Sequence, residues 1–275
     1  MDYPKTTWRL IENPPAEGAW NMAVDEAILE SVYTGDSSPT LRLYAWEPAC
    51  LSLGHVQPFA EVNTEALTEH GWDVVRRPTG GRAILHMDEL TYAVIAPRSE
   101  PRVSGGVLES YLRLSQALLR ALQIIGLSPE AIEKKPPTNP KQPNPVCFEV
   151  PSNYEITVGG KKLIGSAQAR RKEGILQHGA LPLGGDLTRI ITALKFKDDT
   201  ARERAAQRLL VHATTVESVL GTAPTWQRAG EAFTEAFADV LNLSLVPDEL
   251  TARERDRAAE LVEDKYGNPK WTERI

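Results

Sequence analysis

The chain has 275 residues, of which 41% are hydrophobic and 25% charged, proportions that allow a globular protein with a sizeable core. Its formal net charge of -6 argues against general nucleic-acid binding, which needs a basic surface, and two cysteines are too few for a disulfide framework. No apolar run resembles a signal peptide or a membrane span. We therefore expect a cytoplasmic protein with no nucleic acid and no membrane as partner.

The first half of the chain predicts short strands interrupted by a few helices. Strands are expected at 8–11, 41–46, 49–54, 74–77, 83–86 and 90–96, and helices at 18–33, 62–70 and 104–125. Asn63 is a suitable cap for the second helix, and Gly126 ends the third. Cys50 alternates with leucines in its strand, so we expect a buried, inert thiol. Asn21 and Asp25, on the first helix, suit packing as well as function.

The second half opens with a predicted hairpin, in which strands 154–158 and 161–165 are joined by Gly159-Gly160. A charged turn is expected at 169–174, a strand at 175–183, and helices at 187–195, 199–210, 225–241 and 251–266. Because helices do not regularly separate the strands, a doubly wound parallel sheet is not expected. The pattern favours an α/β (α+β) fold with a mixed, largely antiparallel sheet flanked by helices.

The hairpin would bring Lys162 back towards Cys147, which precedes its first strand. A thiol beside a fixed ammonium group forms a thiolate near neutral pH, and a thiolate is a nucleophile. The alternative is a small buried cysteine and a solvated lysine. Residues 134–145, rich in proline, cannot form a helix or an inner strand. This segment is either a lid beside the cysteine or an idle surface loop.

Several motifs together resemble the lipoate/biotin protein ligase superfamily, and most closely its cysteine-dependent octanoyltransferase branch. They are the Ser-Leu-Gly-x-x-Gln of residues 52–57, Arg-Arg-Pro-Thr-Gly-Gly-Arg at 76–82 leading to His86, Cys-Phe-Glu-x-Pro-Ser-x-Tyr-Glu at 147–155, Gly-x-Lys at 160–162, Gly-Ser-Ala-Gln at 165–168 and Leu-Gln-His-Gly at 176–179. The resemblance implies one catalytic domain over residues 1–275, with its core at about 18–245 and a C-terminal helical tail at 246–275.

The resemblance also implies an activity. Octanoyl would pass from octanoyl-acyl carrier protein to Cys147 as an acyl-thioester, with Lys162 lowering the pKa of that thiol. A lysine of a lipoyl-domain carrier, such as the glycine cleavage H protein, would then accept it, and neither a cofactor nor a metal is needed. The substrate-binding residues implied are Arg76, Arg77, Thr79, Gly80, Gly81, Arg82, His86, Gly165, Ser166, Ala167, Gln168, His178 and Gly179.

Two residues depart from the superfamily pattern. Arg82 stands where adenylate-forming ligases usually carry a third glycine, and Met87 stands where an aspartate usually follows the histidine. Whether Asp88 substitutes is left open. The alternatives are an ATP-dependent lipoate–protein ligase of the same fold and a non-catalytic protein that binds acylated carriers. An acidic carrier would need a basic patch, for which the sequence offers Arg76, Arg77, Arg82, Arg170, Arg171 and Lys172.

Overall fold

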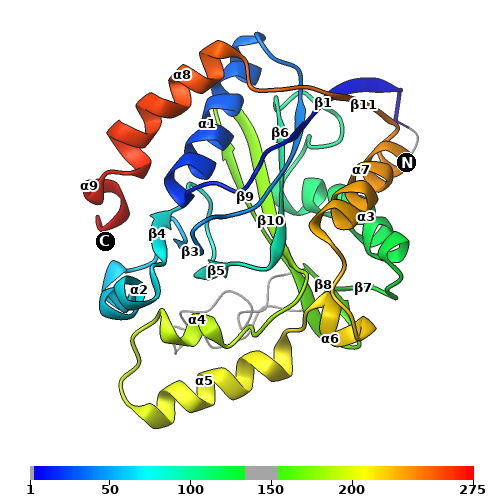
Figure 1. Cartoon of the computed structure of the whole chain (residues 1–275). Helices are drawn as coiled ribbons and strands as arrows, with labels where there is room; N and C mark the ends of the chain where they lie inside the picture. The colour runs from blue at the N-terminus through cyan, green and yellow to red at the C-terminus, as the bar shows by residue number, and fades with distance from the viewer. Residues whose placement is uncertain (1–2, 134–153) are drawn as a thin grey trace.

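The computed structural model describes residues 3–133 and 154–275 (Figure 1). The predictions made for Cys147 and for the proline-rich segment 134–145 therefore lie outside the described residues. Within the two described ranges, no helix combines the length and the apolar character needed to cross a membrane.

A large mixed sheet runs through the centre of the molecule. Its strands are β1 (Thr6–Glu12), β2 (Thr40–Tyr44), β6 (Glu89–Ala96), β7 (Glu130–Glu133), β8 (Tyr154–Val158), β9 (Lys161–Arg171), β10 (Gly174–Pro182) and β11 (Leu243–Pro247). Among the described residues the order across the sheet is β11-β1-β2-β6-β10-β9-β8-β7. β1 pairs in parallel with β2 and with β11, and the other pairs are antiparallel. The predicted mixed, largely antiparallel sheet is confirmed.

A small sheet lies beside the large one and has the order β4-β3-β5. Its strands are β3 (Cys50–Leu53), β4 (Asp73–Arg76) and β5 (Ile84–His86). The α-helices are α1 (Gly18–Thr34), α2 (Thr64–His70), α3 (Val107–Ile125), α4 (Arg189–Thr192), α5 (Asp199–His212), α6 (Val216–Leu220), α7 (Trp226–Val240), α8 (Ala252–Leu261) and α9 (Pro269–Thr272). Short turns η1 (Phe59–Glu61) and η3 (Val262–Tyr266) complete the described elements.

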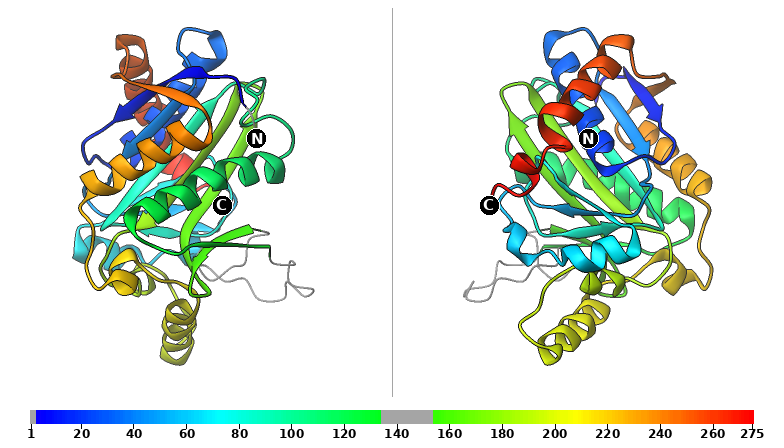
Figure 2. Two further views of the ribbon diagram at one scale, coloured as in Figure 1. Left: turned by 90° about the vertical axis from the view of Figure 1, so that its right-hand side faces the viewer. Right: turned by 60° about the vertical axis from the view of Figure 1, so that its left-hand side comes forward.

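Alternating residues of β6 show how the helices cover the large sheet. Tyr92 and Val94 pack into a core with α3 and α7, whereas Ala93 and Ile95 pack into a second core with α1 and α8. This is the two-residue period of a strand whose faces are both buried. Figure 2 shows α3 and α7 side by side on one face of the sheet. A third core joins the small sheet to α4 and α5.

The hairpin between β8 and β9 forms at the predicted turn. Gly159 and Gly160 have φ angles of 56° and 76°, the left-handed values that a two-residue hairpin of this kind requires and that glycine adopts without strain. The predicted cap Asn63 accepts a hydrogen bond from the Ala66 N–H, and Gly126 ends α3 with φ 108°. Local sequence signals therefore placed these three turns correctly.

Several boundaries differ from the predicted ones. Residues 169–171 continue β9 instead of forming a turn, because they pair with β10. The helix predicted at 187–195 is the single turn α4, and the one predicted at 251–266 is α8 followed by the π-helical turn η3. β7, β11 and α6 were not predicted. β11 is short and pairs with β1, which lies more than two hundred residues earlier in the chain.

Candidate active site

A pocket opens between the small sheet and the centre of the large sheet. The space in it that no atom fills is about 360 Å³, and part of that space is open solvent. It is lined by Met22, Tyr44, Trp46, Ser52, Arg77, Ile84, His86, Thr91, Gly165, Ser166, Ala167, His178, Gly179 and Ala180. Small residues of β9 and β10 form one wall, and Trp46 and Ile84 contribute apolar surface elsewhere in the lining.

The pocket brings together about half of the residues implied by the resemblance. Those that line it are Arg77, His86, Gly165, Ser166, Ala167, His178 and Gly179. Arg76, Thr79, Gly80, Gly81, Arg82, Gln168 and Lys162 lie outside its lining. Gly54 and Gln57 also lie outside, although Ser52 of the same Ser-Leu-Gly-x-x-Gln motif is in the wall.

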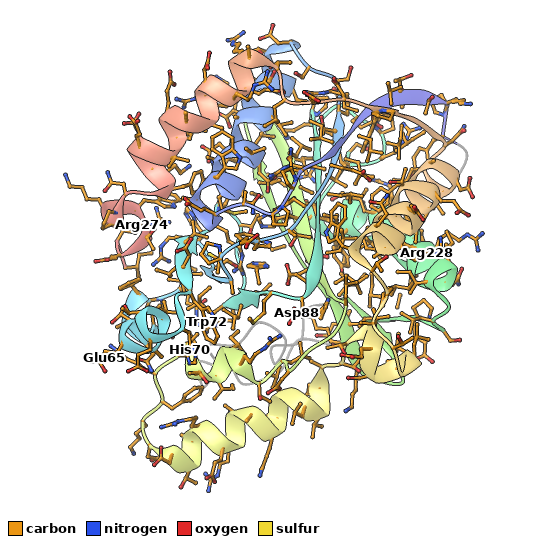
Figure 3. All side chains as sticks on the ribbon, viewed as in Figure 1. Glu65, His70, Trp72, Asp88, Arg228 and Arg274 are labelled. Atoms are coloured by element: carbon orange, nitrogen blue, oxygen red, sulfur yellow. The ribbon has the colours of Figure 1, made fainter. Side chains whose placement is uncertain are left out.

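His86 is held by a serine, a glutamate and a tryptophan. Its Nε2 is 2.8 Å from Ser52 Oγ and its Nδ1 is 2.7 Å from Glu89 Oε1. The Trp46 ring stacks on the imidazole with centroids 4.0 Å apart. The question left open by the sequence is thereby answered, since the acidic partner of His86 is Glu89 and not Asp88. Asp88, labelled in Figure 3, instead accepts a hydrogen bond of 2.5 Å from Arg189 Nη2.

His178 lies in a second buried network, which joins β10 to the Gly80–Gly81 loop and to α1. Its Nε2 is 2.7 Å from Thr79 Oγ1, and its Nδ1 is 3.3 Å from Asp25 Oδ2. Burial lowers the pKa of His178, although the hydrogen bond to Asp25 acts in the opposite direction. Burial alone would raise the pKa of Asp25, but Arg42, 2.7 Å away, and His178 bring it below its usual value. The imidazole is therefore neutral at pH 7. The sequence left open whether Asp25 serves packing or function, and its hydrogen bond to His178 makes it a functional candidate.

Arg76 and Arg77 hold the backbone around the pocket and do not reach the surface. Arg76 donates to the carbonyl oxygens of Gly54, Gln57 and Thr272. Arg77 donates to Ser52 O at 2.9 Å and to Gly80 O at 2.8 Å. The two side chains are almost fully buried, so the prediction that they belong to a basic surface patch is wrong. The backbone carbonyls that they satisfy explain why they are buried.

Three of the other four members of the predicted basic patch are also engaged, whereas Lys172 is exposed. Arg82 has 29% of its side chain exposed and lies 3.8 Å from Glu61. Arg170 donates to Val103 O at 3.2 Å, and Arg171 is 3.4 Å from Glu26. Arg274, labelled in Figure 3 near the C-terminal α9, donates to His55 O at 2.8 Å and so helps to fix the loop after β3.

The Gly80–Gly81 loop packs tightly against the end of β3. Gly81 has φ 94°, a conformation that favours glycine. A Cβ atom on Gly54 would lie 1.9 Å from Gly81 O, so the two segments can approach only because residue 54 has no side chain. The close approach explains the glycine of the Ser-Leu-Gly-x-x-Gln motif.

Ser166 and Gln168, two residues apart on β9, belong to a polar network under α3. Ser166 Oγ is 2.8 Å from Tyr92 OH, which accepts a hydrogen bond of 3.0 Å from Gln177 Nε2. Gln168 Nε2 donates to Gln177 Oε1 at 2.9 Å and to Ser110 Oγ at 3.0 Å. Burial raises the pKa of Tyr92 to about 12. Gln168 therefore supports the pocket wall from behind.

The structure describes one of the two cysteines. Cys50 is fully buried, as predicted, and burial raises the pKa of its thiol well above the usual value. Cys147 lies outside the described residues. Lys162 is 5% exposed, and its Nζ lies 3.7 Å from Glu155 Oε1 on the neighbouring strand β8. Its backbone carbonyl accepts a hydrogen bond from the Thr214 N–H, which fixes the strand on its other side.

The sheet, its two helical faces and the pocket between the two sheets are the features of a catalytic domain of the lipoyl protein ligase type, and comparison with known proteins agrees. Residues 17–238 match the lipoyl protein ligase A/B catalytic domain family. The chain belongs to this family.

Its relatives match over almost their whole length. The chain is 41% identical over 274 residues to the octanoyltransferase LipM of Kyrpidia tusciae, covering 98% of this chain and 99% of the relative. It is 40% identical to the octanoyltransferase LipM of Brevibacillus brevis, covering 96% and 98%. A bipartite lipoate protein ligase from Thermoplasma acidophilum has a similar structure, with a TM-score of 0.79, 25% identity, and coverage of 98% and 96%. A lipoate-protein ligase A bound with ATP gives a TM-score of 0.77 at 25% identity, covering 97% and 98%.

Proposed function

We propose that this protein is an octanoyltransferase that moves an octanoyl group from octanoyl-acyl carrier protein to a lysine of a lipoyl-domain protein. The observation that carries the proposal is the pocket wall built from Gly165, Ala167, Gly179 and Ala180. Small side chains on two adjacent strands leave an apolar slot that suits an unbranched alkyl chain. The similarity to proteins named octanoyltransferase LipM supports the same conclusion.

The first chemical step is assigned to Cys147 from its sequence motif. Its thiolate attacks the carbonyl carbon of the donor thioester, the bond from that carbon to the carrier sulfur breaks, and the carrier thiol leaves with a proton. The octanoyl group is then held as a thioester on Cys147. This exchange of one thioester for another is nearly isoenergetic, so it needs no separate source of energy. Lys162, whose ammonium is held by Glu155, supplies the positive charge that favours a thiolate.

The second step transfers the acyl group to the acceptor. The unprotonated amine of a lysine attacks the Cys147 thioester, the carbon–sulfur bond breaks, and the amine proton passes to the departing sulfur. The product is an amide, which is more stable than a thioester, so this step runs downhill. We propose a lipoyl-domain carrier such as the glycine cleavage H protein as the acceptor, in keeping with the family that the sequence motifs resemble.

The alternative is an ATP-dependent lipoate–protein ligase, and the likeness to a ligase bound with ATP favours it. Arg82 counts against that reading. Its backbone carbonyl accepts a hydrogen bond of 2.7 Å from Arg77 Nη2, and its side chain is directed to Glu61. The loop that would cradle an acyl-adenylate is thereby closed on itself by protein groups.

One assay separates the two functions. The protein is mixed with a lipoyl-domain acceptor and either octanoyl-acyl carrier protein without ATP, or free octanoate with ATP and magnesium. We expect the acceptor to gain one octanoyl group only in the first mixture, as measured by intact mass. Modification only in the second mixture would establish a ligase and refute the proposal.

A further inference from the structure

A serine and a histidine of the pocket wall are joined in series to a glutamate that lies behind them. Ser52 Oγ on β3 is 2.8 Å from His86 Nε2 on β5, and His86 Nδ1 is 2.7 Å from Glu89 Oε1 at the start of β6. Ser52 and His86 both line the pocket, and all three side chains are at least nine-tenths buried. The three residues of this triad come from three different strands. None of the sequence motifs indicated that they would form a triad.

The donors on either side of the triad indicate the direction of its hydrogen bonds. Trp46 Nε1 can only donate, and it donates to Thr91 Oγ1 at 2.8 Å; Thr91 in turn donates to Glu89 Oε1 at 2.5 Å. At the other end Arg77 Nη1 can only donate, and it donates to Ser52 Oγ at 3.1 Å. Glu89 therefore accepts from His86 Nδ1–H, and in a neutral imidazole the Ser52 hydroxyl then donates to His86 Nε2.

This assignment gives His86 one particular tautomer. Its Nδ1–H donates to the Glu89 carboxylate, so its Nε2 carries the lone pair and faces the hydroxyl of Ser52. A serine is activated as a nucleophile by this arrangement of base and orienting carboxylate. The Arg77 guanidinium beside Ser52 Oγ would also stabilise the negative charge that develops on the oxygen as its proton leaves.

We propose that Ser52, His86 and Glu89 form a second acyl-accepting centre in the pocket, with Ser52 as its nucleophile. The proposal rests on the proposed function only in taking the pocket as an acyl site, and it does not involve Cys147. Its substrates are carbonyl compounds with an apolar chain that fits the pocket, activated as a thioester or an ester.

The chemistry balances without a further reactant. Ser52 Oγ bonds to the carbonyl carbon while its proton passes to His86 Nε2. The carbon–sulfur or carbon–oxygen bond then breaks, and the leaving group takes that proton from His86, which leaves an acyl ester on Ser52. Water attacks the ester next, its proton returns through His86 to Ser52 Oγ, and a carboxylic acid is released.

The test uses the full chain carrying Cys147→Ala, so that no reactive thiol competes. The protein is incubated with octyl fluorophosphonate, whose phosphorus takes the place of the acyl carbon and whose fluoride leaves. We expect one adduct by intact mass, located on Ser52 by peptide mapping. Because general-base catalysis contributes about 10²- to 10⁴-fold, we expect labelling to slow by about that factor in His86→Ala and to be lost in Ser52→Ala.

Two serines provide controls. Ser115, buried on α3, has its Oγ bonded to Leu112 O, so Ser115→Ala should keep the labelling rate. Ser166 also lines the pocket, but its hydroxyl meets Tyr92 and not a histidine, so its peptide should stay unmodified. The labelled serine is identified in the Cys147→Ala protein, in which Ser52, His86 and Glu89 are unchanged. This measurement therefore does not depend on whether the Ser52 and His86 variants fold.

Three results would overturn the proposal: no adduct on Ser52, an adduct on Ser166 in its place, or an unchanged labelling rate in a folded His86→Ala protein. Each would show that the three residues only tie the strands together. Failure of octanoyl transfer through Cys147 is measured separately in the acceptor assay, and it would leave labelling of Ser52 unaffected.

Discussion

Lys162 and Glu155 face one another across the β8–β9 hairpin, with Nζ and Oε1 3.7 Å apart and the two side chains 5% and 3% exposed. Glu155 is the last residue of the Cys-Phe-Glu-x-Pro-Ser-x-Tyr-Glu motif that begins at Cys147. The motif therefore contains both the proposed nucleophile and the carboxylate that holds its proposed cationic partner. Such a carboxylate limits where the ammonium can move.

The first prediction concerns the thiol. Lys162→Met combined with Glu155→Gln removes the ammonium together with the carboxylate that faces it. Removing only one partner of a buried ion pair typically costs about 3–5 kcal/mol. Because a nearby cation favours the thiolate, we expect the pH at which iodoacetamide alkylates Cys147 to rise towards that of a free thiol, about 8.5. Alkylation rates against pH, read by peptide mass, measure this.

The exposed neighbour Lys161 provides the matched control, since its Nζ donates to Leu210 O instead. Lys161→Met should leave the alkylation profile unchanged. An unmoved profile in the double variant would mean that Lys162 does not act on the thiol.

The second prediction follows from the lowered pKa of His178. Burial is the main cause, and the charge of Arg77 adds to it. The unfolded chain therefore takes up the His178 proton at a higher pH than the folded chain does. As pH falls below about 6.5, the free energy of unfolding should decrease by up to about 1.4 kcal/mol per pH unit until the folded histidine also titrates.

Urea unfolding between about pH 7 and pH 5 measures this slope. In His178→Asn the contribution of this residue disappears, so the slope should be flatter. His212→Asn, at the exposed end of α5, should keep the slope of the unmodified protein. Equal slopes in all three proteins would show that protonation of His178 is not linked to folding.

The third prediction concerns chain length. Ala167 lines the pocket, so Ala167→Leu should fill part of the slot and shift donor preference from octanoyl to shorter acyl groups. Ala169, two residues further along β9 on the same side of the strand, lies outside the lining, and Ala169→Leu should keep the original preference. Competition between butanoyl, hexanoyl and octanoyl donors measures the shift, and an unchanged preference in Ala167→Leu would place the acyl chain elsewhere.

The fourth prediction concerns the loop behind the pocket. Gly54→Ala places a Cβ against the Gly81 carbonyl, and overpacking of this kind costs about 1–3 kcal/mol. Thermal unfolding should show a lower midpoint. Gly80→Ala is the matched control for stability, since a Cβ there meets nothing within 4 Å. Equal midpoints for the two variants would show that the loop can move away from residue 54 at little cost.

The sequence predicted the features that depend on local chemistry. The glycine pair of the hairpin, the Asn63 cap and the end of α3 at Gly126 are each set by the conformations of a few neighbouring residues. The strand predicted at 90–96 is β6, which begins one residue earlier. Residues 165–167 and 178–179 were placed at the site by their motifs, and they do line the pocket.

What the sequence missed depends on contacts between distant segments. β11 is recognisable as a strand only through its pairing with β1. The sequence left open whether Asp88 replaces the aspartate that usually follows the histidine. The backbone of Asp88 has φ 49°, and it is Glu89 whose side chain reaches the imidazole. The resemblance implies a substrate-binding role for Arg76, and nothing in the sequence indicated that its guanidinium binds backbone carbonyls, including Thr272 O from the far end of the chain.

The acyl-enzyme tests the account most directly. The protein is mixed with octanoyl-acyl carrier protein in the absence of ATP and acceptor, quenched in acid, and its intact mass and peptides are measured. The account predicts a gain of one octanoyl group on the peptide that contains Cys147, present in Cys50→Ala and absent in Cys147→Ala. Transfer to the acceptor by the Cys147→Ala protein at a rate comparable to that of the unmodified protein would contradict it.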